Sequence, residues 1–81
     1  MIIKILGPCD DNCARIERTV RDVLARLSVT AQVERVDDPR EIVRLGVRVT
    51  PALLLDDRVA VAGRVPTAAE VQSLLAALPA A

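Results

Sequence analysis

Residues 1–13, MIIKILGPCDDNC, decide the fold of this chain. Residues 2–6 form an apolar, β-branched run in which Lys4 is the only polar residue, and Gly7 and Pro8 end the run. An apolar run bounded by turn residues is typical of a buried strand. The stretch therefore predicts a buried strand that turns sharply and leads into a segment with two cysteines.

A helix is predicted from about residue 10 to residue 27. Asp10 and Asp11 suit the positive end of its dipole, and Arg26 suits the negative end. Apolar residues recur at spacings of three and four, which gives one buried stripe. That stripe consists of Cys13, Ile16, Val20, Val23, Leu24 and Leu27.

Residues 30–36 predict a second strand, and a short helix is expected after it. Asp38 can cap this helix, Pro39 suits its first position, and Glu41 completes a capping-box spacing. Gly46 stands at the usual place for a helix end.

Two apolar runs, residues 52–55 and 59–62, surround residues 56–58 and predict a hairpin. Thr67 and Glu70 have capping-box spacing and open a last helix. The apolar side of that helix carries Val71, Leu74, Leu75 and Leu78.

The predicted order is β-α-β-α-β-β-α. Two strands joined through a helix are expected to be parallel with a right-handed crossover, whereas the hairpin strands are antiparallel. The fold class is therefore α/β, with a mixed four-stranded sheet flanked by three helices. A length of 81 residues allows one domain, residues 1–81.

Composition excludes several classes of function. Eleven basic residues balance eleven acidic ones, and the chain has no aromatic residue and no histidine. A nucleic-acid binder is not expected, because both a basic patch and aromatic stacking platforms are missing. No apolar run reaches the roughly 18 residues that a membrane span requires. The opening apolar run is too short for a signal peptide, so a cytoplasmic protein is expected.

Cys9 and Cys13 carry the remaining chemistry, because Ser-His and Cys-His catalysis both require histidine. A helix N-terminus stabilises a thiolate, although Asp10 and Asp11 oppose it. Cys13 continues the apolar stripe and is expected to be partly covered, whereas Cys9 is expected to be more exposed. This contrast fits an attacking thiol and a resolving thiol.

The C-x-x-x-C spacing limits how these cysteines can pair. Two helical residues four positions apart have Cβ atoms about 5–6 Å apart, whereas a disulfide needs about 3.5–4.5 Å. A bridge therefore requires Cys9 to lie in a non-helical entry turn, which Gly7 and Pro8 permit. The alternative is that Cys13 is a core residue and Cys9 an incidental loop thiol.

The order of elements, the two cysteines and Thr50-Pro51 together resemble the thioredoxin superfamily. The likeness is greatest to its very small members, the redox-active disulfide proteins, and includes residues 2–7, Gly46-Val47 and residues 63–66. It implies a thioredoxin-like fold with a cis-proline at Thr50-Pro51, where the Thr50 backbone can pair with an extended partner chain. The alternative is an ordinary trans proline at a strand start.

The same resemblance implies a thiol-disulfide oxidoreductase or small electron carrier. Cys9 and Cys13 would form its redox-active disulfide, and Thr50 and Pro51 would bind the substrate. Small members of the superfamily usually carry G-x-G-C-x-x-C; here Asp10 holds the place of the nucleophile and Cys9 that of the second glycine. The implied partners are a protein disulfide or dithiol and an upstream reductase, with no cofactor and no metal.

Two other functions stay open, as does the oligomeric state. Two thiolates suit one soft metal or metalloid ion, but a four-cysteine site would need a dimer. A redox-inert adaptor could keep the peptide groove while residues 10–12 alter partner preference. Arg48 and Arg64 either line the rim of such a groove and bind an acidic partner or are solvated surface charges.

Overall fold

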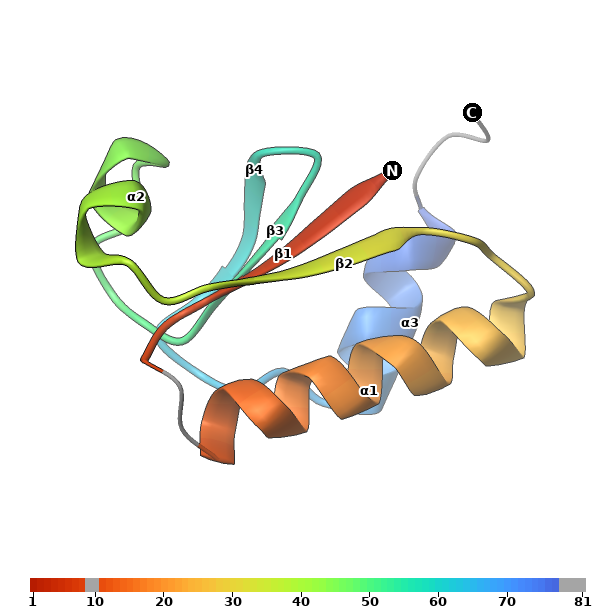
Figure 1. Cartoon of the computed structure of the whole chain (residues 1–81). Helices are drawn as coiled ribbons and strands as arrows, with labels where there is room; N and C mark the ends of the chain where they lie inside the picture. Colours follow the sequence, from red (N-terminus) through yellow and green to blue (C-terminus); the bar gives the residue numbers. More distant parts are fainter. Residues whose placement is uncertain (9–10, 78–81) are drawn as a thin grey trace.

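The computed structural model describes residues 1–8 and 11–77. The elements run β1 (Ile2–Leu6), α1 (Asp11–Leu27), β2 (Gln32–Val36), α2 (Pro39–Arg44), β3 (Ala52–Leu55), β4 (Arg58–Ala62) and α3 (Ala68–Ala76). The predicted order and the α/β fold class are confirmed, and the arrangement is thioredoxin-like (Figure 1). Leu78 lies outside the described residues.

The four strands form one mixed sheet in the order β2-β1-β3-β4. β1 runs parallel to β2, from Ile2 opposite Gln32 to Leu6 opposite Val36. β1 is antiparallel to β3, and β3 is antiparallel to β4. The predicted parallel and antiparallel pairings are both confirmed, and β1 is a central strand as its apolar sequence indicated.

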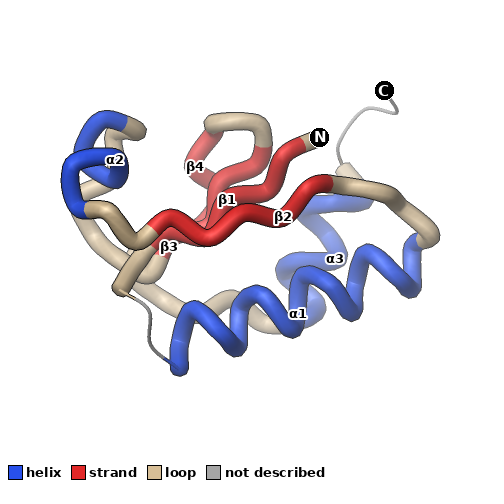
Figure 2. Tube along the Cα trace, in the orientation of Figure 1, coloured by secondary structure: helices blue, strands red, loops and turns tan. Residues whose placement is uncertain are grey.

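Helices cover the two faces of the sheet unequally. α1 and α3 lie side by side on one face, whereas the short α2 lies on the other (Figures 1 and 2). Side chains alternate between these faces along β1, because successive residues of a strand point in opposite directions. Ile3 and Ile5 belong to the core cluster that includes α1 and α3, and Leu6 belongs to the cluster that includes Ile42 of α2.

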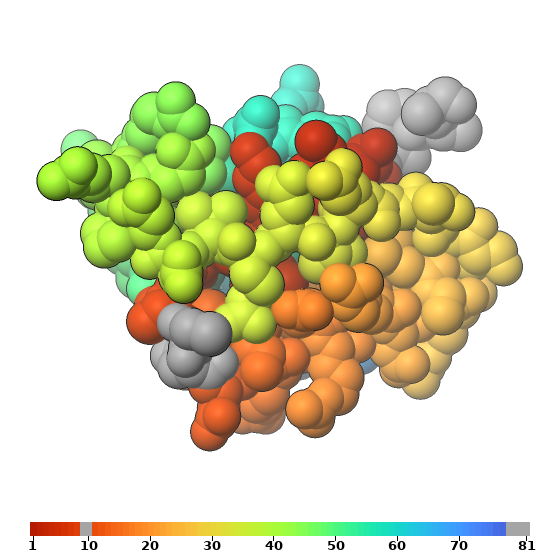
Figure 3. All heavy atoms as spheres, in the orientation of Figure 1, coloured from red at the N-terminus to blue at the C-terminus, as the bar shows by residue number. Residues whose placement is uncertain are grey.

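The apolar stripe predicted for α1 forms most of the helix side of the larger core. Its buried members are Cys13, Ile16, Val20, Val23 and Leu24, and Leu27 is partly buried against them. In the space-filling view, β1 is largely covered by side chains of β2 and α1 (Figure 3). The core of the described residues is thus filled by aliphatic side chains and Cys13, as expected for a chain without aromatic residues.

The second strand begins two residues later than predicted. The Gln32 amide donates to the Met1 carbonyl at 3.0 Å, and the first parallel pair joins Ile2 to Gln32. The ladder can begin only where β1 begins, so residues 30 and 31 have no place in it. The length of the partner strand therefore sets this boundary.

The hairpin turn is one residue shorter than predicted. Asp56 and Asp57 have φ values of +50° and +65°, and Leu55 is paired with Arg58 directly across the turn. Two successive residues with positive φ are typical of a tight two-residue hairpin, whose twist matches that of the strands. β4 therefore begins at Arg58.

Capping side chains fix both later helices. The Asp38 carboxylate accepts a hydrogen bond from the Arg40 amide at 2.9 Å, so Asp38 caps α2 as predicted. The capping box that the Asp38–Glu41 spacing predicted does not form, because the Glu41 carboxylate pairs instead with Arg44, 2.6 Å from Nη2. The capping box of α3 is confirmed, with the Glu70 amide donating to Thr67 Oγ1 at 3.1 Å. Within the described part of the chain, no helix combines the length and apolar content needed to cross a bilayer.

Replacement of Leu53 by alanine is expected to destabilise the fold. Leu53 is 1% exposed in β3, so truncation leaves a cavity and costs about 2–5 kcal/mol of unfolding free energy. The measurement is urea unfolding followed by circular dichroism, since the chain has no tryptophan or tyrosine for fluorescence.

The matched control for this variant is Val59→Ala in β4. Val59 is 48% exposed, so its truncation is expected to cost less than about 1 kcal/mol. Equal losses in the two variants would contradict the assignment of Leu53 to the core.

The ion pair at the start of α3 is expected to make stability depend on acid pH. Hydrogen bonds from the Arg64 guanidinium, and then from the Thr67 backbone, lower the pKa of Glu70 from 4.5 to about 2. A lowered folded-state pKa means that the contribution is complete above pH 4.5 and is lost as the pH falls through about 2. Urea titrations of the wild type and Glu70→Gln are expected to converge over this range, and a constant difference would contradict the pairing.

Candidate functional site

Gly7 is the point at which three distant segments meet. A Cβ atom at this residue would lie 2.8 Å from Cys13 Sγ, 3.5 Å from Thr50 Cβ and 3.6 Å from Pro51 Cα. Gly7 is buried and has a φ of +152°, which side-chain-bearing residues rarely adopt. The structure therefore brings together Cys13, Thr50 and Pro51, three of the four predicted site residues.

Cys13 is more deeply buried than expected. It lies in the first turn of α1 with 0% of its surface exposed, and Sγ is 3.9 Å from the Leu6 carbonyl oxygen, to which the thiol donates. The expectation of partial cover is corrected, because Gly7 and β1 close over the end of the apolar stripe. Because the thiol is fully buried, a group that reacts with it must be positioned next to it within the structure.

The Thr50–Pro51 peptide bond is cis. The Pro51 carbonyl accepts a hydrogen bond from the Gly63 amide at 2.9 Å. A Cβ atom at Gly63 would lie 2.9 Å from Cγ1 of Val49, the residue before Thr50. Gly63 thus holds the loop in place by close approach, a contact that sequence reasoning missed; the only sequence signal was a glycine just before the last helix.

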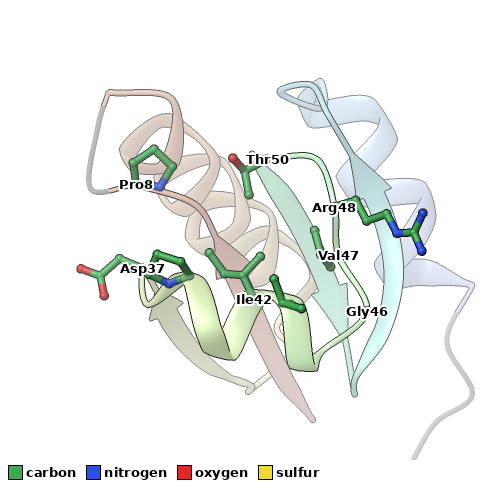
Figure 4. A pocket seen from close by; sticks show the side chains of 9 residues that line it. Pro8, Asp37, Ile42, Gly46, Val47, Arg48 and Thr50 are labelled. Atoms are coloured by element: carbon green, nitrogen blue, oxygen red, sulfur yellow. The ribbon is translucent and has the colours of Figure 1, made fainter.

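A groove runs along α2 from the thiol region. Its volume is about 660 Å³. The residues that line it are Pro8, Asp37, Pro39, Ile42, Val43, Gly46, Val47, Arg48 and Thr50 (Figure 4). Thr50 lines the groove and also lies against Gly7, so one end of the groove is adjacent to the region of the buried thiol.

The two arginines considered at the sequence level have different positions. Arg48 is exposed and lines the groove. The Arg64 guanidinium instead donates two hydrogen bonds to the Glu70 carboxylate, one of them from Nη1 to Oε1 at 2.7 Å. These bonds raise the pKa of Arg64, and they hold its charge at the start of α3.

Cys9, Asp10 and the expected Cys9–Cys13 disulfide lie outside the described residues. Pro8 is exposed and leads directly to Cys9, while Asp11 begins α1 on the other side. Over residues 1–8 and 11–77, no three cysteine, aspartate, glutamate or histidine side chains are grouped to hold a metal ion.

The structure thus has the cysteine at the start of a helix and the cis-proline loop that the resemblance to the thioredoxin superfamily implied. The chain belongs to the thioredoxin domain family, whose pattern matches residues 1–76. It is 28% identical to a thioredoxin from Methanothermobacter thermautotrophicus over 75 residues. The matched region covers 93% of this chain and 97% of that protein. Membership in this family supports a thiol-disulfide redox role in general.

Replacement of Gly7 by alanine is expected to disturb the packing of Cys13. The new Cβ would lie 2.8 Å from Sγ in a backbone conformation with φ of +152°, and the strained backbone alone costs about 1–3 kcal/mol. The measurement is the urea unfolding free energy of Gly7→Ala, Cys13→Ala and the double variant. We expect the double variant to be more stable than the sum of the single losses predicts, with a coupling of about 0.5–3 kcal/mol.

Gly46→Ala separates backbone strain from the steric clash. Gly46 also has a positive φ, +84°, but no atom lies within 4 Å of its Cβ position. Its replacement is therefore expected to cost stability without coupling to Cys13→Ala. Additive losses for Gly7→Ala and Cys13→Ala would contradict the close approach described above.

Proposed function

We propose that this chain, as a single thioredoxin-like domain over residues 1–81, is a thiol-disulfide oxidoreductase or small redox carrier. It exchanges a Cys9–Cys13 dithiol or disulfide with a partner protein. The observation that carries the proposal is the position of Cys13 Sγ, buried at the start of α1 and across Gly7 from Thr50 and Pro51. Membership in the thioredoxin domain family supports the same chemistry.

The position of Cys13 suits a resolving thiol. α1 has 17 residues, and the positive end of its dipole stabilises a thiolate in the first turn. A fully buried sulfur is shielded from a large partner, so we do not assign the first attack to Cys13. Cys9, which follows the exposed Pro8, is the thiol that we assign to the first attack.

The proposed exchange balances over two steps. The Cys9 thiolate attacks one sulfur of the partner disulfide, forms a mixed disulfide, and releases the other partner sulfur as a thiolate. The Cys13 thiolate then attacks the Cys9 sulfur, forms the Cys9–Cys13 bond, and releases the second partner sulfur. The partner gains two electrons and two protons, and an upstream reductase returns the chain to the dithiol.

Thr50 and Pro51 are proposed to hold the partner backbone during this exchange. Pro51 has no N–H group, and its carbonyl is already bonded to the Gly63 amide. Thr50 is therefore the residue of this loop that we assign to a main-chain pairing with the partner, as in β-strand addition.

Replacement of Cys13 by serine is expected to trap the first intermediate. Cys9 can still attack, but nothing resolves the mixed disulfide, so a covalent adduct with a disulfide-containing protein substrate accumulates. Non-reducing electrophoresis and intact mass measure the adduct, and turnover with a dithiol reductant is expected to fall at least about 100-fold.

Cys9→Ser supplies the matching variant and is expected to form no adduct and to lose turnover. Wild-type turnover that survives Cys9→Ser would contradict the assignment of the attacking thiol. Stoichiometric Zn²⁺ binding that requires both cysteines, in a wild-type chain without disulfide turnover, would favour a metal-binding module instead.

A further inference from the structure

The groove along α2 has apolar walls. Ile42 and Val47 are buried in the smaller core cluster and also line the groove. Val43, next to Ile42 on α2, is 72% exposed and lines the groove as well. An exposed apolar side chain beside a concave apolar surface indicates that the groove accepts an apolar group.

The two ends of the groove carry opposite charges. In Figure 4, Asp37 and Arg48 lie on opposite sides of the groove, with Ile42 and Val47 between them. Both charged residues are exposed, and they come from different loops, before and after α2. The chain as a whole has no net charge, so this polarity is a local property of the groove.

The groove is also large enough and close enough to the thiol region to hold part of a partner. Its volume of about 660 Å³ falls within the range of about 300–1,000 Å³ that is usual for ligand sites. Pro8 and Thr50 line it, and Thr50 also lies against Gly7. A chain segment in the groove would therefore lie beside the proposed exchange site.

From these observations we infer that the groove selects an extended partner segment with an apolar side chain between two opposite charges. The acidic residue of the segment pairs with Arg48, the basic residue pairs with Asp37, and the apolar side chain lies against Val43 and Ile42. The charge order sets the direction of the bound segment. The inference rests on the proposed function for its biological role, since it names the class of partner that the exchange site receives.

Fluorescence anisotropy with matched peptides tests the inference without any covalent step. The labelled peptides have about eight residues, no cysteine and a central leucine; two carry Glu and Lys around the leucine in opposite orders, and a third carries Gln at both places. We expect the wild type to prefer one charge order by about three- to tenfold, because each exposed ion pair has a small effect. The preference is expected to disappear in 1 M salt, where the Debye length is about 3 Å.

Variants of the chain identify the residues responsible. The double variant D37K/R48E reverses the polarity of the groove and is expected to reverse the preferred peptide order. Val43→Ser is expected to weaken binding of all three peptides. Arg58→Glu and Val59→Ser change exposed residues of β4 that do not line the groove, and they are the matched controls that leave binding unchanged.

Two results of the peptide measurements would overturn the inference. One is equal affinity of the wild type for both charge orders; the other is a preference that D37K/R48E does not reverse. A wild-type dimer whose formation excludes the peptides would also overturn it, because the groove would then receive a second copy of the chain.

Reduction of the small uncharged disulfide 2-hydroxyethyl disulfide distinguishes this inference from the proposed function. No turnover by the wild type, together with an order preference that D37K/R48E reverses, would reject the proposed function and retain the groove assignment.

Discussion

The geometry of the candidate site depends on the lack of a side chain at Gly7. A Cβ atom there would lie 2.8 Å from the sulfur of Cys13 and within 3.6 Å of Pro51 Cα. Any larger residue would clash with the Cys13 sulfur unless the neighbouring atoms shifted. The candidate site therefore depends on a backbone approach, and the buried core behind it keeps that approach fixed. Gly63 acts similarly on the other side of the loop, through its contact with Val49.

The two faces of the sheet have different roles. One face packs against α1 and α3 and forms the larger aliphatic core, which supports the helix that begins beside the thiol. The other face packs against α2, and this helix also lines the groove. Ile42 belongs to both the core and the groove, so packing in the smaller cluster shapes the surface that a partner meets. Stability and recognition are thus coupled at α2.

Much of the fold could be predicted because its signals are local. The apolar run of residues 2–6, the helical stripe through Cys13, and the capping box of Thr67 and Glu70 each depend on neighbours in sequence. The start of β2 depends on a distant partner, because β2 begins opposite Ile2. The start of β4 depends on the backbone of the two turn residues, Asp56 and Asp57, whose positive φ values allow Leu55 to pair with Arg58. The full burial of Cys13 likewise results from cover by a separate segment. Resemblance, rather than periodicity, supplied the expectation for Thr50 and Pro51.

The sequence by itself determined the order of the elements, the aliphatic core and the confinement of reactive chemistry to two cysteines. Hydrophobic period, capping residues and composition act within one segment, so they can be read along the chain. Only the tertiary structure decided that Cys13, Gly7 and Pro51 meet, that Arg64 pairs with Glu70, and that Asp37 and Arg48 lie at opposite ends of one groove. Those relations depend on how the sheet and helices pack, because packing brings together residues that are far apart in sequence.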